Sequence, residues 1–131
     1  MEKKELRQIN TTALAYLGDA VYEQAVREHI LRKGTYNANN LHASAVQYVK
    51  AQAQANVIKL IYDQLTEEEQ SLVKRARNRK YTSRSRNTDP VTYKWATAFE
   101  ALVGYLYLEE SRASEERLKW VIEQAIEITG K

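Results

Sequence analysis

Two acidic residues of this chain stand where charged side chains are unusual. Asp19 lies inside an apolar helical pattern, directly after Gly18. Aspartate and glycine are both poor interior helix residues, and departures from local preference concentrate at functional sites. Glu100 lies in a second helical pattern, among small and apolar neighbours. These two carboxylates are therefore the first candidates for chemistry.

Their chemistry depends on whether two remote segments meet in space. If the two helices cross, small residues would allow close approach and the carboxylates would converge. A converging pair, in a chain with no cysteine and two histidines, suits a hard cation such as Mg²⁺ or Mn²⁺. The alternative is that both are ordinary boundary residues, each hydrogen-bonded to a neighbour. The small residues beside them are Gly18, Ala20, Ala101 and Gly104.

A basic segment, residues 74–86, lies between these two motifs. It holds seven of the 20 basic residues and no acidic one, so the remainder carries 13 basic against 17 acidic residues. Such a local concentration of positive charge indicates an anionic partner at one place, although a charge run is often only a solvated face. With Asn78 added, the predicted RNA-binding residues are Lys74, Arg75, Arg77, Asn78, Arg79, Lys80, Arg84 and Arg86.

The composition of this segment favours RNA over other anions. Arginine forks, amides and hydroxyls suit contacts with phosphates and 2′-hydroxyl groups. A-form RNA is recognised mostly by shape and backbone, so we expect selectivity for duplex structure more than for sequence. A DNA-binding regulator is a weaker alternative, because the basic residues fall partly in a predicted loop rather than along one recognition helix.

The composition of the whole chain sets the fold class. With 131 residues, 44% hydrophobic and 28% charged, the sequence predicts one globular domain spanning 1–131. Four glycines and one proline are too few for strands joined by tight turns. The absence of cysteine argues against a disulfide-stapled secreted domain. We find no membrane-spanning run and no signal peptide, and we expect a cytoplasmic protein.

Apolar periodicity and capping residues predict an all-α domain of about six helices. The first strong helix starts near 10–12 and runs to Lys33, and the second starts at Asn39 or Asn40 and breaks near 46–50. Later helices begin after Thr66, after Asp89 and after Ser114, and 81–87 is predicted to be a basic loop.

The two acidic motifs together resemble the catalytic domain of the ribonuclease III family. The resemblance rests on Leu-Gly-Asp-Ala-Val at 17–21 and on Phe-Glu-Ala-Leu-Val-Gly at 99–104, in this order on two helices. It covers nearly the whole chain and looks closest to the short bacterial branch, Mini-ribonuclease III, which lacks a double-stranded-RNA-binding domain. The resemblance implies an all-α ribonuclease III-like domain over 1–131.

The resemblance also implies roles for the two acidic residues. Asp19 and Glu100 match two of the four carboxylates around the family's metal site, and would hold Mg²⁺ or Mn²⁺ for catalysis. The other two positions hold Ala15 and Thr97 instead. Water can complete the octahedron of Mg²⁺, so a minimal working site is expected. The alternative is a non-catalytic double-stranded-RNA-binding module with a degenerate ribonuclease III fold.

The family mechanism implies hydrolysis of double-stranded RNA, leaving 5′-phosphate and 3′-hydroxyl ends. It further implies a homodimer, with Leu14, Leu17 and Tyr22 as candidates for the interface, although each could equally be a core residue. For the short branch, the implied substrate is the precursor of 23S ribosomal RNA, with possible help from a large-subunit ribosomal protein.

Overall fold

The computed structural model describes residues 1–34, 36–80 and 89–131. Within these ranges the chain forms seven α-helices, one 3₁₀-helix and no strand, which confirms the all-α prediction and adds one helix to the expected six. The helices are α1 (Lys3–Leu6), α2 (Thr11–Arg32), α3 (Ala38–Val49), α4 (Ala51–Ile61), α5 (Glu67–Asn78), α6 (Pro90–Glu109) and α7 (Arg112–Thr129), with the 3₁₀-helix η1 (Tyr62–Gln64) after α4.

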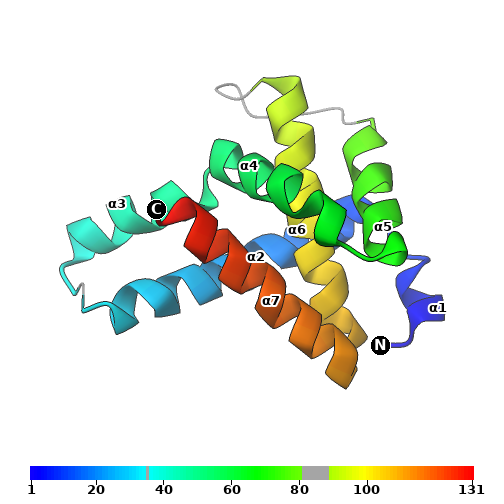
Figure 1. Cartoon of the computed structure of the whole chain (residues 1–131), viewed down its shortest axis with the longest axis horizontal. Helices are drawn as coiled ribbons and strands as arrows, with labels where there is room; N and C mark the ends of the chain where they lie inside the picture. The colour runs from blue at the N-terminus through cyan, green and yellow to red at the C-terminus, as the bar shows by residue number, and fades with distance from the viewer. Residues whose placement is uncertain (35, 81–88) are drawn as a thin grey trace.

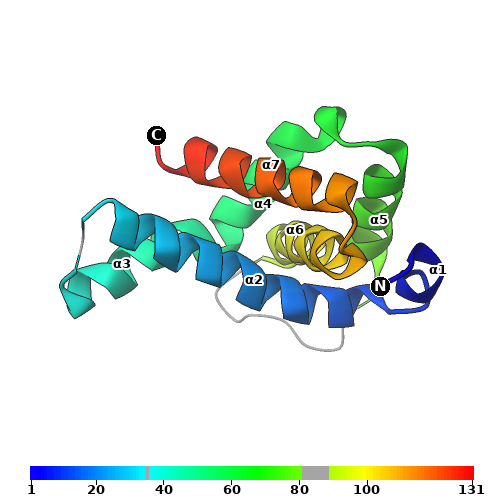
Figure 2. The same ribbon diagram turned by 90° about the horizontal axis from the view of Figure 1, so that it is seen from below.

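Helix α6 is the centre of the molecule. It is surrounded by α2, α4, α5 and α7 (Figure 1), and it appears nearly end-on between α2 and α7 in Figure 2. Almost every residue from Ala96 to Leu106 is buried. A helix that is apolar around most of its circumference belongs inside a protein. The motif around Glu100 therefore lies on the most enclosed element of the fold.

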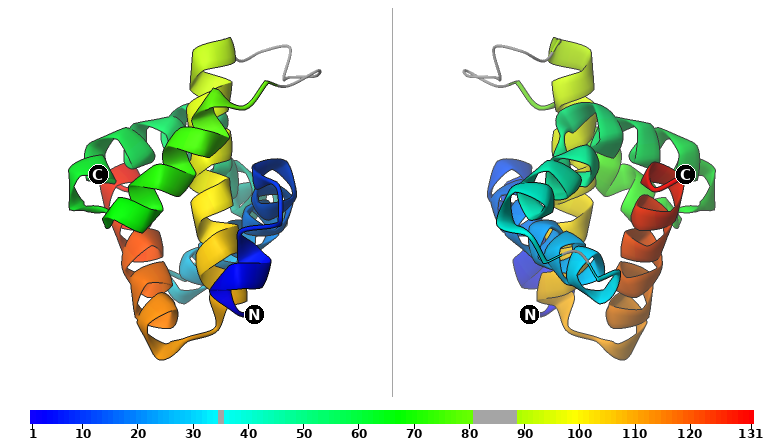
Figure 3. Two further views of the ribbon diagram at one scale, coloured as in Figure 1. Left: turned by 90° about the vertical axis from the view of Figure 1, so that its right-hand side faces the viewer. Right: turned by 90° about the vertical axis from the view of Figure 1, so that its left-hand side faces the viewer.

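The longest helix, α2, packs against α6 along its first half. Phe99 of α6 and Tyr22 of α2 meet edge to face, with ring centroids 4.9 Å apart, and both side chains are buried. Beyond this contact the second half of α2 extends outward with α3 beside it, as Figure 1 and the two side views of Figure 3 show. This packing fixes the rotation of α2, and with it the direction in which Asp19 faces.

Local capping signals set most helix starts, as predicted. Asn10 caps α2 by accepting a hydrogen bond from the Ala13 backbone nitrogen, at 2.8 Å. Thr66 and Glu69 form a capping box at α5. Asp89 caps α6, with Pro90 in the first helical position. These side chains satisfy backbone donors that a helix start leaves free, which is why such short motifs determine boundaries.

Two predicted caps were wrong. Helix α3 is capped by Asn37, not by Asn39 or Asn40, which lie inside its first turn. Helix α7 is capped by Ser111, and Ser114 is instead the third residue of the helix, where its hydroxyl completes a capping box with Ser111. Competing polar residues within one turn offer similar caps, so local sequence alone does not rank them.

The predicted break in the long apolar run lies at Lys50. Its backbone is extended, with φ −65° and ψ 151°, so α3 ends at Val49 and α4 starts at Ala51. The break lets α3 follow α2 while α4 turns across α6 (Figure 1). In the part of the chain that the structure describes, no helix is long and apolar enough to cross a membrane.

Candidate active site

Helices α2 and α6 touch backbone to backbone at two glycines. A Cβ atom added at Gly18 would lie 1.7 Å from the backbone oxygen of Glu100. One added at Gly104 would lie 2.0 Å from the backbone oxygen of Leu14. Both distances are far inside van der Waals contact, so only glycine fits at these positions. The close approach places residue 19, next to Gly18, beside residue 100.

The structure brings Asp19 and Glu100 together at this crossing. Burial is the largest cause that raises the pKa of Glu100, and the hydrogen bond and negative charge of Asp19 raise it further, to about 9. Asp19 is exposed, whereas Glu100 is half-buried. The two carboxyl groups, 81 positions apart in the chain, therefore lie within hydrogen-bonding reach, one on the surface and one beneath it.

This pair of carboxyl groups fits a divalent cation. Two acidic groups in contact cannot both ionise at low cost unless a proton or a cation lies between them. Carboxylate oxygens are the ligands that Mg²⁺ and Mn²⁺ prefer. The raised pKa of Glu100 shows how strongly this site resists a second negative charge when no cation is present.

The protein offers no further carboxylate at the two positions that depart from the family pattern. Ala15 is buried, and Thr97 is buried with its hydroxyl donating to the backbone oxygen of Tyr93 at 2.9 Å. Across residues 1–34, 36–80 and 89–131, no group of three or more histidine, cysteine, aspartate or glutamate side chains is arranged to hold a metal ion. Solvent would have to complete the coordination of an ion held by this pair.

Glu23, one turn after Asp19, is engaged elsewhere. Its Oε1 atom lies 3.3 Å from Nη2 of Arg27, in an ion pair on the surface of α2. Pairs at this spacing on a helix are common and weak. The structure therefore pairs Glu23 with Arg27.

Gln54 is a residue that the sequence did not single out. It lies on α4, its side chain is only 2% exposed, and its Nε2 atom is buried without a hydrogen-bond partner among the described residues. The side chain lies close enough to Glu100 to act against the rise in the pKa of that carboxyl group. A buried amide donor next to a carboxyl group favours the ionised form. The only signal in the sequence was a polar residue within an otherwise apolar helical face.

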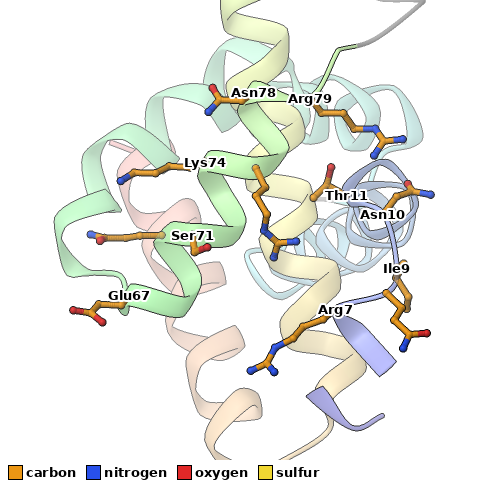
Figure 4. Close-up of a pocket in the computed structure, with 12 residues that line it drawn as sticks. Arg7, Ile9, Asn10, Thr11, Glu67, Ser71, Lys74, Asn78 and Arg79 are labelled. Carbon is orange, nitrogen blue, oxygen red and sulfur yellow. The ribbon is translucent and has the colours of Figure 1, made fainter. Parts of the chain in front are cut away.

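The structure places the residues of the basic segment in different surroundings. Arg77 stacks over the ring of Trp95, with its guanidinium carbon 4.9 Å from the centroid, and donates a hydrogen bond to Asn78 at 3.1 Å. Lys80 is exposed at the end of the described stretch, and Arg84 and Arg86 lie outside the described residues. The members that line one groove beside α5 are Lys74, Arg75, Asn78 and Arg79 (Figure 4).

Two of the three interface candidates are core residues. Leu14 and Tyr22 are each 1% exposed and belong to the main hydrophobic core, and Leu17 is half-buried. The exposed aromatic side chain of this helix is Tyr16, at 86%. The apolar stripe of α2 is turned towards α6, so for Leu14 and Tyr22 the structure favours the core alternative over the interface that the resemblance implied.

The comparisons with known proteins agree with this geometry. Residues 12–111 match the family model of the ribonuclease III domain. The chain is 46% identical over 132 residues to a Mini-ribonuclease 3 of Brevibacillus brevis, covering 98% of this chain and 96% of that protein. It is 40% identical over 131 residues to a Mini-ribonuclease 3 of Enterococcus faecalis, covering 98% and 99%.

A solved structure is also similar. A crystal structure of a protein from Fusobacterium nucleatum matches with a TM-score of 0.80 and 35% identity, over 94% of this chain and 96% of that one. Sequence and fold thus point the same way over nearly the whole chain. The chain belongs to the ribonuclease III family and, within it, to the Mini-ribonuclease 3 group.

Proposed function

We propose that this chain is a metal-dependent endoribonuclease that hydrolyses double-stranded RNA, with Asp19 and Glu100 as its metal ligands. Its membership in the ribonuclease III family supports the endoribonuclease role. The observation that carries the proposal is the glycine contact between α2 and α6, which brings the two carboxyl groups into reach of each other. We also infer that residues 1–131 act as one catalytic domain.

The cation in this proposal is Mg²⁺, with Mn²⁺ as a substitute. Bound between the carboxylates, it would activate water and neutralise charge that develops on a phosphodiester. The ionised form of Glu100, which would hold the ion, is favoured by the nearby side chain of Gln54, which acts against the rise in the pKa of that carboxyl group. The backbone contact at Gly18 and Gly104 holds both carboxylates in place, so the chain supplies a preorganised pair of ligands.

We further propose a homodimer as the active form. Cutting both strands of a duplex requires two sites, and a two-fold dimer supplies them with one kind of chain. Tyr16 supports this assembly, because a tyrosine that is 86% exposed lies three residues before Asp19. Burying such a side chain against a second copy removes a large aromatic surface from water.

The proposed substrate is the precursor of 23S ribosomal RNA, cut to leave 5′-phosphate and 3′-hydroxyl ends. A large-subunit ribosomal protein bound to the precursor is the proposed helper. This substrate and this helper come from the resemblance to the Mini-ribonuclease 3 group, and duplex selectivity is expected from the basic segment.

A cleavage assay tests the proposal. The protein is incubated with a structured RNA duplex with and without Mg²⁺, beside Asp19→Asn, Glu100→Gln and the control Glu23→Gln. We expect metal-dependent cleavage that falls at least about a hundredfold in the first two variants, as when a charge-stabilising group is removed, and remains in the third. Loss of activity in the control alone would contradict the assignment.

A non-catalytic RNA-binding module is the second candidate, favoured by Ala15 and Thr97 in place of carboxylates. The same assay separates the two functions, because a module binds the duplex and leaves it intact at every Mg²⁺ concentration. Preference for duplex DNA over duplex RNA would instead support a DNA-binding regulator.

A further inference from the structure

One face of α5 is polar and open to solvent along its whole length. Its residues recur at helical spacing and line a groove of about 820 Å³. Most of these side chains are exposed, so the space is an open groove rather than an enclosed cavity. The residues of this wall are Glu67, Gln70, Ser71, Lys74, Arg75, Asn78 and Arg79.

The opposite wall is the segment that joins α1 to α2. It contributes Arg7 and Asn10, which lie on the other side of the groove from α5 (Figure 4). Arg7 lies 67 positions before Lys74, the first residue of the basic segment, and no local pattern groups the two. Only the packing of α2 and α5 on α6 brings the two together.

The groove is strongly positive. Four cationic side chains, Arg7, Lys74, Arg75 and Arg79, line it against one carboxylate, Glu67. Within the part of the chain that the structure describes, none of these four cations forms a salt bridge. The charges of Lys74, Arg75 and Arg79 are therefore available to an external anion, and that of Arg7 also helps to lower the pKa of Glu68. An open groove with cations on both walls suits a polyanionic strand.

The groove also lies close to the carboxylate pair. Thr11, the first residue of α2, lines the groove, and Asp19 follows eight residues later on the same helix. At 1.5 Å per residue the separation along the helix axis is about 12 Å. The groove and Asp19 therefore border the same helix, about two turns apart.

We propose that this groove holds the sugar–phosphate backbone of the RNA substrate, and that Arg7 binds it from the wall opposite Arg75 and Arg79. Ser71 and the amide of Asn78 supply the hydroxyl and donor groups that ribose recognition uses. The inference rests on the proposed ribonuclease function, and adds to it a second wall from the N-terminal segment.

Salt-dependent binding tests it. The protein carries Asp19→Asn, so that the RNA is expected to stay intact. It is titrated against a fluorescent RNA duplex at several KCl concentrations. Each phosphate contact contributes about one to the slope of log affinity against log salt. We expect Arg7→Gln and Arg79→Gln each to reduce the slope by about one, and Arg7→Lys to restore it. Lys119→Gln, an exposed cation on α7, should leave the slope unchanged.

The outcomes separate this inference from the proposed function. A smaller slope in Arg79→Gln with an unchanged slope in Arg7→Gln would overturn the two-walled groove and leave the basic segment in its role. Unchanged slopes in both would overturn the groove as an RNA path. Failure of the parent protein to bind or cleave any duplex would instead defeat the proposed function. Thermal unfolding of each variant shows that a lost contact is not lost folding.

Discussion

At the scale of single residues, Glu100 is where burial and charge act together. It is half-buried beside Asp19, and both features raise its pKa, to about 9. A carboxyl group in ordinary solvent ionises near pH 4.5. Between these values the folded protein keeps a proton that the unfolded chain has lost, so the metal-free protein stores an electrostatic cost at its own site. A cation held at the proposed site would offset that cost.

This cost predicts an unusual pH dependence of stability. Because the folded state binds the Glu100 proton more tightly, the stability of the metal-free protein should fall as the pH rises from about 4.5 towards 9. Glu100→Gln should unfold at the same temperature as the parent near pH 4, and at least about 4 °C higher near pH 8. Thermal melts in a chelator measure both.

The same melts contain the control. Addition of Mg²⁺ should raise the unfolding temperature of the parent at pH 8 and leave that of Glu100→Gln nearly unchanged, since a cation takes over the role of the proton. Parallel pH profiles of the two proteins would show that Glu100 ionises normally and would remove the electrostatic argument for the site.

At the scale of elements, the crossing of α2 over α6 determines the site. Gly18 and Gly104 let the two backbones meet, and the Tyr22–Phe99 contact fixes the rotation of α2. A second link joins α5 to α7, where Arg117 donates to the buried carboxylate of Glu69 at 2.7 Å. Glu69 also belongs to the capping box of α5, so one side chain both starts a helix and anchors it.

The close contact of α2 and α6 predicts the effect of adding one methyl group at the crossing. In Gly104→Ala the new methyl group would meet the backbone oxygen of Leu14, which cannot move without shifting α2. Alanine otherwise favours a helix by about 1 kcal/mol over glycine. We expect a net loss of about 2–4 kcal/mol in the free energy of unfolding, measured by urea denaturation, with loss of cleavage.

A matched substitution away from the crossing shows whether the helix contact causes the loss of stability and of cleavage in Gly104→Ala. Ala43→Gly, at an exposed position in the interior of α3, alters only helix propensity and should cost about 1 kcal/mol without affecting cleavage. A Gly104→Ala protein that is more stable than the parent would mean that the helices do not touch at this point.

At the scale of the whole molecule, the positive groove, the carboxylate pair and an exposed aromatic side chain all lie along α2. The positive groove lies between α5 and the segment before α2, and the carboxylate pair lies farther along α2. Tyr16 extends from the same helix and is almost fully exposed. An arrangement in which one helix borders the groove, carries Asp19 and presents an aromatic side chain suits a two-fold assembly around α2.

Tyr16→Asp should therefore dissociate the proposed dimer. In a two-fold interface each substitution acts twice, and an aspartate that replaces a buried tyrosine should weaken association at least about a hundredfold. Sedimentation equilibrium would report a mass near 15.2 kDa in place of twice that value. Tyr36→Asp is the control, because Tyr36 is 75% exposed but lies before α3.

Either of two results would count against this interface. A parent protein that sediments as a monomer with full activity would exclude the dimer. Dissociation by Tyr36→Asp and not by Tyr16→Asp would move the interface to the outer end of the molecule, beside α3.

The sequence by itself determined what depends on neighbours within about one turn. Helix type followed from apolar periodicity and from few turn residues, and the starts at Thr66 and Asp89 followed from capping side chains three residues from the donors they satisfy. The two acidic motifs were recognisable because each is contiguous in the chain.

Only the tertiary structure decided what depends on the rotation of one helix against another. Three features are of this kind. The amide of Gln54 is buried without a partner among the described residues, and Arg7 lies in one groove with α5. On α2, the exposed residue is Tyr16, and Leu14 is in the core. Periodicity gives the width of an apolar stripe, but the packing partner decides which edge of that stripe is covered. Residues far apart in sequence acquire a shared environment only when backbone contacts such as the one at Gly18 fix the distance between helices.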